Sequence, residues 1–272
     1  MPWGSQPYTP PVRHVLLGDR PHPRIRALLE GTGWPLLVRA LSAADGVTVG
    51  RAYVDDADTP SWVLLWEGGG QLVVGGRPPA AARIEVFERL RRAGHVGLLA
   101  WADEPEVIDA YPGEVEHHDG LIFSGPLASR ERLRELAALP PEVSARPADA
   151  ALIPHLAWRR SVVEGVFGGA QAFLERGRSI CLFEGESLVA ESYGTARADG
   201  VIELGIVAHQ PARRRGLGTA ASALMALACL GEGLAPTWHC DARNLPSAAI
   251  ARRLGFAHVR RTTERWWVPS LA

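Results

Sequence analysis

The sequence predicts an α/β (α+β) protein in which a mixed α/β module precedes a second module with a sheet flanked by helices. Three observations support this fold class. Apolar segments of strand length alternate with segments of helical periodicity along the chain. The length of 272 residues exceeds the usual size of one domain. Two prolines, Pro140 and Pro141, end a helical segment near the middle, so we place the modules at residues 1–139 and 140–272.

The first module is expected to mix helices and strands, and it contains no motif that indicates chemistry. We interpret the proline-rich residues 1–20 as an irregular lead-in. Helical spacing of apolar residues predicts helices at residues 23–30, 80–93 and 129–139, with Ser129 as the N-cap of the last. Strands are expected at residues 47–54, 62–66, 71–74, 95–101 and 121–123.

The second module is expected to form a sheet covered by helices, because strands and helices alternate along it. Helices are expected at residues 149–165, 170–176, 219–230 and 246–254. Strands are expected at residues 142–146, 179–183, 188–196, 201–208, 236–241 and 259–268.

Composition and charge exclude several classes of function. The 29 basic and 30 acidic residues nearly balance, whereas a general binder of nucleic acid or anionic membranes carries a basic excess. The three cysteines form no CxxC pair, so we expect neither a disulfide framework nor a metal site. Residues 1–20 contain no apolar block of signal-peptide length, and the most apolar stretch, 220–230, is too short to span a bilayer. The expected location is the cytoplasm.

The most informative segment is a strand, a turn with the sequence RRRGLG at residues 213–218, and an apolar helix. Gly216 and Gly218 let the backbone approach a ligand closely and adopt positive φ. The N–H groups at the start of the following helix suit a diphosphate. Alternatively, this is an ordinary glycine-containing connection with solvated arginines. It is neither a P-loop, which requires GKS or GKT, nor a GxGxxG dinucleotide motif.

Three features in this order resemble the GNAT (Gcn5-related) N-acetyltransferase superfamily over about the last 130 residues. They are the R/Q-x-x-G-x-G turn at residues 213–218, Asn244 at the start of a helix, and Leu254-Gly255-Phe256. A looser set, Trp238, Cys240, Asn244 and Ser247, resembles a bacterial subgroup with an extra N-terminal module. The resemblance implies a mixed, mostly antiparallel splayed sheet and acetyl-CoA as cosubstrate.

The resemblance also implies where acetyl-CoA binds. Backbone groups of the strand before the turn would contact pantetheine, and the amides that follow would hold the diphosphate. Asn244 would contact the cofactor, although a helix N-cap is the alternative role. The implied cofactor-binding residues are Ile206, Val207, Ala208, Arg213, Arg214, Arg215, Gly216, Leu217, Gly218, Thr219, Asn244 and Ser247.

Catalysis requires a base, because an amine with a pKa near 10 is mostly protonated at neutral pH. The resemblance points to Glu203, for which a solvent-facing strand charge is the alternative, and to His239, for which a structural role is the alternative. Glu191 is a weaker candidate. Many family members carry a proton-donating tyrosine seven residues after the asparagine, where this chain has Ala251.

The expected function is therefore transfer of acetyl from acetyl-CoA to a primary amine of a small molecule. A non-catalytic coenzyme A binding or sensing module is the alternative, which the absence of the tyrosine favours. The first module would wall the substrate site or stabilise the second, and a degenerate GNAT-like half is one interpretation of it. We expect a monomer or homodimer with no nucleic acid or membrane partner.

Overall fold

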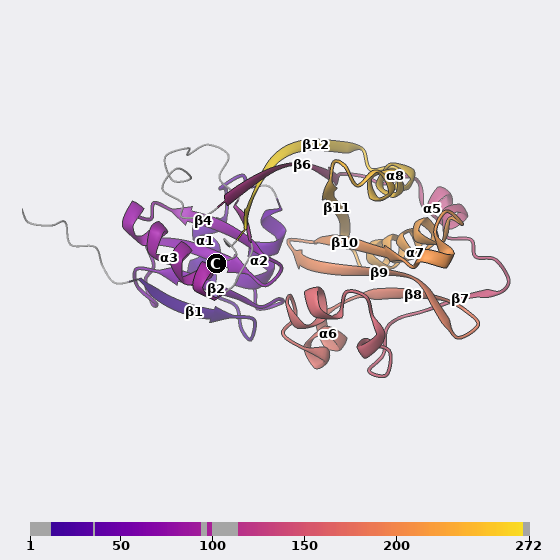
Figure 1. Ribbon diagram of the computed structural model, residues 1–272, viewed down its shortest axis with the longest axis horizontal. Helices are drawn as coiled ribbons and strands as arrows, with labels where there is room; N and C mark the ends of the chain where they lie inside the picture. Colours follow the sequence, from indigo (N-terminus) through magenta and orange to yellow (C-terminus); the bar gives the residue numbers. More distant parts are fainter. Residues whose placement is uncertain (1–11, 35, 94–96, 100–113, 269–272) are drawn as a thin grey trace, which may run out of the picture.

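The computed structural model describes residues 12–34, 36–93, 97–99 and 114–268 (Figure 1). In chain order the first half forms β1 (Arg13–Leu17), α1 (Pro23–Leu29), α2 (Leu37–Ala44), β2 (Gly50–Val54), β3 (Trp62–Glu67), β4 (Gln71–Gly76), α3 (Ala80–Arg92), β5 (Gly97–Leu99), β6 (Glu114–Ser124) and α5 (Arg130–Leu136). The predicted N-cap is confirmed, since the Ser129 hydroxyl accepts a hydrogen bond from the Arg132 N–H at 3.1 Å.

Two elements of this half differ from the sequence prediction. The predicted lead-in contains a strand, β1, which pairs with β2. Helix α2 was not predicted, although its buried Ala40, Leu41 and Ala44 have helical spacing. The helix begins after Leu36, which has a φ of 59° and provides no side-chain cap, so the usual signal for a helix start is missing.

The second half forms β7 (Val143–Arg146), η1 (Ile153–His155), η2 (Arg159–Glu164), α6 (Ala170–Arg176), β8 (Ser179–Glu184), β9 (Ser187–Ala198), β10 (Val201–Ala208), η3 (Gln210–Ala212), α7 (Leu217–Gly231), β11 (Ala235–Asp241), α8 (Leu245–Leu254) and β12 (His258–Val268). The prediction of one helix at residues 149–165 is wrong. A 3₁₀ turn and a π-helix replace it, because Pro154 lacks an N–H donor and Leu156 has an extended backbone.

Twelve strands of the described chain join in one sheet, in the order β1-β2-β3-β4-β5-β12-β6-β11-β10-β9-β8-β7. The predicted fold class is confirmed, since most neighbouring strands are antiparallel and helices flank the sheet (Figure 1). The two halves of the sheet have the same arrangement. From one edge, β1 to β5 are followed by β12, the last strand of the second half. From the other edge, β7 to β11 are followed by β6, the last strand of the first half. In both halves the fourth and fifth strands are the parallel pair. Strand β6 pairs with both β11 and β12, so the sheet is continuous across the predicted boundary.

Strands β10 and β11 diverge halfway along their length. They pair in parallel from Val201 opposite Ala235 to Leu204 opposite Trp238. Beyond this point β10 pairs only with β9, as far as Ala208, while β11 pairs with β6. The divergence opens the sheet on the C-terminal side of Leu204, next to the N-terminus of α7.

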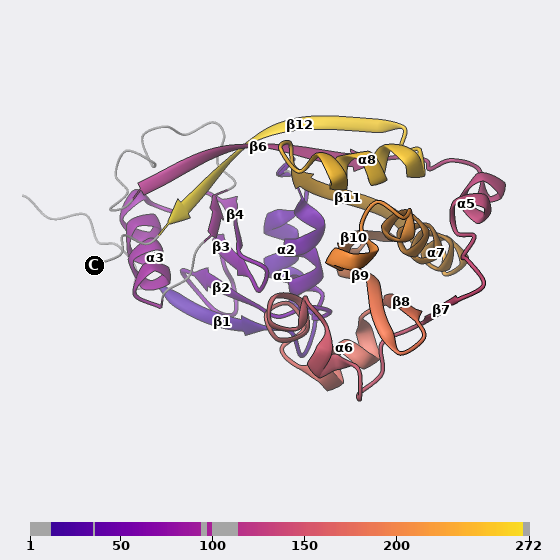
Figure 2. The same cartoon turned by 45° about the vertical axis from the view of Figure 1, so that its right-hand side comes forward.

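Helices and irregular segments cover the two faces of the second half of the sheet. Helix α7 packs on one face, where its buried Ala223 and Met225 join a core with Leu204 and Trp238. On the other face, η1, η2 and α6 form a core around Trp158. Helix α2 of the first half lies against β9 and β10 (Figures 1 and 2). Among the described residues, no helix has the length and apolar character needed to cross a membrane.

The two halves meet closely where the β3–β4 turn reaches the π-helix. The Val49 N–H donates to the Val166 carbonyl at 2.8 Å. A Cβ added to Gly68 would lie 2.0 Å from the Gly165 carbonyl oxygen. Both partners of this contact are backbone, so neither can move aside as a side chain would.

Gly68→Ala is therefore expected to lower the free energy of unfolding by about 1–3 kcal/mol, because the new methyl group forces the two halves apart. Gly231→Ala, near the end of α7, is the matched control, since a Cβ there meets nothing within 4 Å. Its stability should be unchanged or slightly higher. Chemical denaturation of both variants tests this, and equal midpoints would contradict the contact.

Candidate functional site

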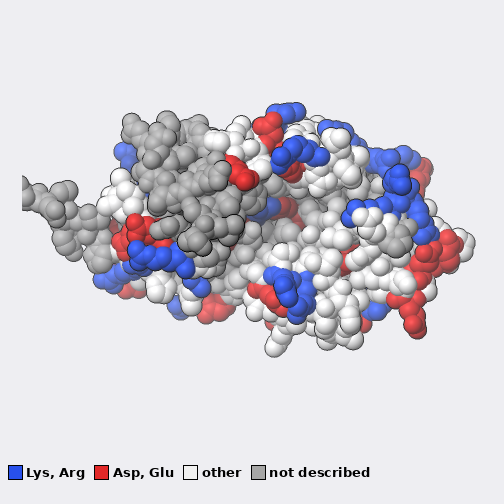
Figure 3. All heavy atoms as spheres, viewed as in Figure 1, with Lys and Arg blue, Asp and Glu red and all other residues white. Residues whose placement is uncertain are grey.

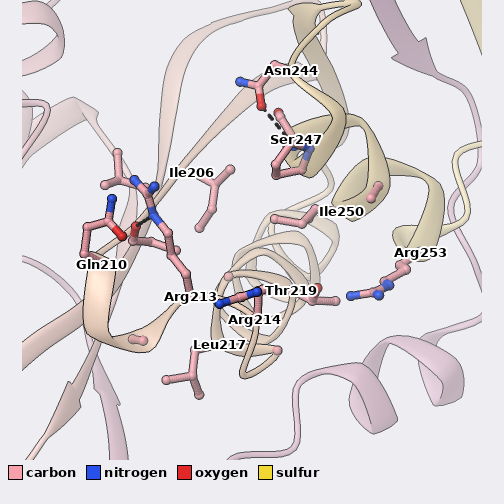
Figure 4. Close-up of a pocket in the computed structure, with 17 residues that line it drawn as sticks. Ile206, Gln210, Arg213, Arg214, Leu217, Thr219, Asn244, Ser247, Ile250 and Arg253 are labelled. Atoms are coloured by element: carbon pink, nitrogen blue, oxygen red, sulfur yellow. Dashed lines mark hydrogen bonds between the residues drawn. The ribbon is translucent and has the colours of Figure 1, made fainter.

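A cleft of about 980 Å³ lies beyond the point where β10 and β11 diverge. Its walls are the end of β10, the turn before α7, and one face of α8 (Figure 4). All predicted cofactor-binding residues except Arg215 line it. The structure adds Gln210, Ala212, Pro246, Ala249, Ile250 and Arg253. The last four lie on one face of α8, and helical spacing from Asn244 could have identified them.

The turn before α7 leaves the first N–H groups of the helix open to the cleft. Gly216 occupies the N-cap position with a φ of 83°, and no side chain caps the helix. Arg214 also has a positive φ, 63°, so the backbone curls around the helix start. A helix N-terminus of this kind attracts anions through its N–H groups and its dipole.

The three arginines of the turn have different surroundings. The Arg213 Nε donates to the Ala208 carbonyl at 3.0 Å, which fixes the turn to the end of β10. Arg214 lines the cleft. Arg215 instead forms two hydrogen bonds, at 2.6 and 2.9 Å, with the Glu184 carboxylate and lies outside the cleft lining. The hydrogen bonds from Arg215 hold the pKa of Glu184 below its usual value.

Basic side chains gather near this end of the molecule, over α5, α7 and α8 (Figure 3). In the close-up, Arg213 and Arg214 lie beside the first turn of α7, and Arg253 extends from α8 toward it (Figure 4). These three guanidinium groups add positive charge to the N-terminus of the helix. The described residues contain no group of His, Cys, Asp and Glu that could hold a metal ion.

Helix α8 forms the opposite wall of the cleft. The Asn244 side chain accepts from the Ser247 N–H at 3.2 Å, so Asn244 is the helix N-cap and also lines the cleft. The Ser247 hydroxyl accepts a hydrogen bond from the Trp238 indole at 3.0 Å. Ala251 is fully buried in the core behind this wall, so it offers nothing to the cleft.

The structure brings Glu203 and His239 together with an arginine from the first half. Glu203 lies on β10 and is only 3% exposed, so it is not a solvent-facing strand charge. The Arg39 guanidinium on α2 donates to both Glu203 oxygens, at 2.5 and 2.7 Å. The same guanidinium lies 3.5 Å from Nδ1 of His239, which projects from β11. These side chains share the face of the sheet opposite α7, beside the point where β10 and β11 diverge.

Two opposing effects determine the charge of Glu203. Burial raises its pKa, but the positive charge and hydrogen bonds of Arg39 outweigh burial, and the net pKa lies below its usual value. Glu203 is therefore ionised at neutral pH and is a weak proton acceptor.

A second buried carboxylate, Glu67 at the end of β3, faces this group from the first half. It accepts hydrogen bonds from the N–H groups of Gly69 and Gln71, at 2.6 and 2.8 Å. Burial raises its pKa, and the charge of Arg39 partly opposes this. Sequence reasoning missed both Arg39 and Glu67. The first lies on an unpredicted helix, and the second has the appearance of an ordinary charge before a glycine turn.

The weaker candidate Glu191, on β9, is fully buried and bonds to Nε2 of His209 at 2.5 Å. Burial raises its pKa, while His209 opposes the rise. His209 follows the last residue of β10, so this pair lies at the turn end of the strand, away from Glu203.

Comparisons with known proteins identify what this arrangement resembles. The model of the GNAT acetyltransferase family matches residues 27–263. A GCN5-related N-acetyltransferase-like protein from Streptococcus suis is similar in structure, with a TM-score of 0.69 and 22% identity over 90% of this chain and 98% of that one. A search of curated proteins finds no match.

Two further solved structures share the fold at lower similarity. A tandem GNAT protein from the clavulanic acid biosynthesis pathway has a TM-score of 0.55 and 14% identity, over 94% of this chain and 97% of that one. A GCN5-related N-acetyltransferase from Kribbella flavida has a TM-score of 0.51 and 19% identity, over 77% and 87% of the two chains.

Arg39→Leu is expected to destabilise the protein by about 3–5 kcal/mol at pH 7, because it leaves the Glu203 carboxylate buried without its partner. Without Arg39, burial raises the folded-state pKa of Glu203 above its unfolded value. The loss of unfolding free energy should therefore grow as pH rises from 5 to 7. Denaturant unfolding at both pH values measures this.

Arg39→Leu combined with Glu203→Leu should recover much of that loss, since no unpaired charge remains. Arg92→Leu is the control: its exposed pair with Glu88 should contribute at most about 1 kcal/mol. If Arg39→Leu lowered the free energy of unfolding equally at pH 5 and pH 7, the result would contradict a charged Glu203.

Proposed function

The chain belongs to the GNAT acetyltransferase family, and we propose that it transfers acetyl from acetyl-CoA to a primary amine of a small molecule. One observation carries the proposal: the cleft runs from the unpaired edge of β10 to the uncapped N-terminus of α7. It therefore offers open strand backbone at one end and an anion site at the other. An acyl-CoA has the same two parts, a thin amide-containing arm and a diphosphate.

The residues present fit this cosubstrate. Ile206, Val207 and Ala208 would pair with the amides of pantetheine, because β11 does not pair with them. The N–H groups from Arg214 to Thr219 would hold the diphosphate. Asn244 and Ser247 would contact the arm from α8 while keeping their structural hydrogen bonds.

The acceptor amine would approach from the opposite face, where Glu203 and His239 lie. Attack on the thioester carbonyl puts positive charge on the amine nitrogen. The ionised Glu203 carboxylate would stabilise that charge, and His239 would take the proton. In this role Arg39 keeps Glu203 charged, and the carboxylate need not become protonated.

We infer that the first module, residues 1–139, is a degenerate GNAT-like half that walls the acceptor side. Support comes from the repeated order of its strands and helices and from Arg39, which reaches Glu203. In the first half, β4 leads to Gly76-Arg77-Pro78-Pro79 instead of an arginine- and glycine-rich turn. The first module would therefore contribute side chains to the site but lacks the turn sequence that precedes α7.

A coenzyme A binding module without catalysis is the second candidate, and Ala251 is the observation that favours it. Thiol release from acetyl-CoA over a panel of primary amines separates the two. An enzyme releases thiol in proportion to one or more amines, whereas a binding module releases none.

Binding of acetyl-CoA, measured by calorimetry, tests the premise shared by both candidates. Arg214→Gln is expected to weaken binding about tenfold or more, through loss of a charge-assisted contact to phosphate. Arg215→Gln is the matched control, since Glu184 already occupies that guanidinium, and its affinity should change less than about threefold. Equal effects of the two variants would place the diphosphate elsewhere.

Glu203→Gln is expected to lower kcat at least about tenfold, with an unchanged KM for acetyl-CoA, because the neutral amide no longer stabilises the charged nitrogen. Glu186→Gln, at an exposed turn, provides the control. Steady-state thiol release with the best amine measures both. An unchanged kcat in Glu203→Gln would leave this carboxylate with a structural role only.

A further inference from the structure

One tyrosine lies across the strand that borders the cleft. Tyr193 on β9 is the register partner of Gly205 on β10, and its ring covers that glycine. A Cβ added to Gly205 would lie 2.4 and 2.6 Å from Cε2 and Cζ of the ring and 2.9 Å from the hydroxyl oxygen. The ring therefore extends from β9 over β10, and only glycine at position 205 leaves room for it.

The tyrosine hydroxyl lies over Gly205, the residue of β10 that directly precedes those lining the cleft. Leu204 opposite Trp238 is the last pair between β10 and β11, so Gly205 is the first residue beyond it. The next residues, Ile206 to Ala208, line the cleft as far as the turn. A pantetheine arm that followed these residues away from the N-terminus of α7 would direct its sulfur toward Gly205 and the hydroxyl above it.

No described residue hydrogen-bonds to the Tyr193 hydroxyl. The oxygen is not fully sealed from solvent, although most of the side chain is buried. The ring itself is fixed. It stacks on the Trp158 ring, with 4.5 Å between the ring centroids. Trp158 in turn packs edge-on against Phe173, with 5.1 Å between their centroids. A rigid ring whose hydroxyl has no partner among the described residues is a preorganised hydrogen-bond donor.

The charges near this hydroxyl decide what it can do. Burial, and then the carboxylates of Glu191 and Glu203, raise the pKa of Tyr193 to about 12, while Arg39 opposes them. The phenol is therefore protonated across the neutral range. A thiol has an ordinary pKa of about 8.5, so complete proton transfer from this phenol to a thiolate is unfavourable. Donation of a hydrogen bond to the thiolate is favourable.

We propose that the Tyr193 hydroxyl donates a hydrogen bond to the sulfur of acetyl-CoA and stabilises it as the thioester breaks. The inference rests on the proposed function. The amine nitrogen forms a bond to the carbonyl carbon, the C–S bond breaks, and its electron pair stays on sulfur. The nitrogen loses one proton to His239 and then to water, and coenzyme A leaves as the thiolate. Tyr193 thus does from β9 part of what a tyrosine at position 251 would do from α8.

Tyr193→Phe tests this, because it keeps the ring on Gly205 and Trp158 and removes only the hydroxyl. The first readout is the pKa of the thiol of bound coenzyme A, followed by thiolate absorbance as pH is varied. The variant should raise this pKa by about one unit, since the bond that favours the charged form is lost. The second readout is kcat, which should fall about ten- to a hundredfold while the affinity for acetyl-CoA changes less than about threefold.

Tyr53→Phe is the matched control, since it removes the hydroxyl of a buried tyrosine in the first half. Thermal unfolding of both variants reports their folding. If Tyr193→Phe leaves both the thiol pKa and kcat at wild-type values, the inference is overturned and the proposed function stands. If the folded wild-type protein does not bind coenzyme A, the proposed function itself fails. A merely structural tyrosine predicts lower stability with an unchanged thiol pKa.

Discussion

The site depends on one constraint: the backbone of β10 beyond Leu204 pairs with only one neighbouring strand. Backbone N–H and C=O groups in a protein interior need partners. From Gly205 to Ala208, β9 supplies partners on one side, and β11 has turned away on the other. A ligand with its own amides satisfies that edge. Where β11 leaves β10, it pairs with β6 of the first half. The same divergence therefore opens the cleft and joins the two halves of the sheet.

The buried charges follow from the same geometry. Diverging strands expose the face opposite α7, and α2 of the first half covers it. Covering this face would leave Glu203 buried and charged without a partner, at a cost of several kcal/mol. Arg39 offsets that cost, and it also ties the first half to β10 next to the point where the strands diverge. The contact between Gly68 and Gly165 is a second place where the two halves meet closely, so the surroundings of Glu203 depend on how the halves pack.

Local signals in the sequence predicted most of the residues that line the cleft, whereas the cluster around Glu203 depends on long-range contacts. The turn at residues 213–218 and Asn244 act through neighbouring residues, so a short motif describes them. Arg39 and Glu203 are 164 positions apart, and α2 has no capping residue to mark its start. Residues 149–165 had helical periodicity, yet Pro154 and the packing of Trp158 produce a 3₁₀ turn and a π-helix instead. The three-residue prediction for β6 underestimated an eleven-residue strand, because its length depends on partners in the second half.

Packing behind α8 explains why a proton-handling group would come from the other side of the sheet. Trp238 is almost fully buried, and its indole holds Ser247 in the first turn of α8. Ala248 and Ala251 follow on the same buried face, with no exposed surface. A tyrosine at position 251 would overpack this core or require Trp238 to move. The large Trp238 on β11 therefore requires a small residue such as Ala251 on α8. That packing leaves the opposite face, where Gly205 makes room for the ring of Tyr193, as the side from which a side chain would reach the sulfur in the proposed reaction.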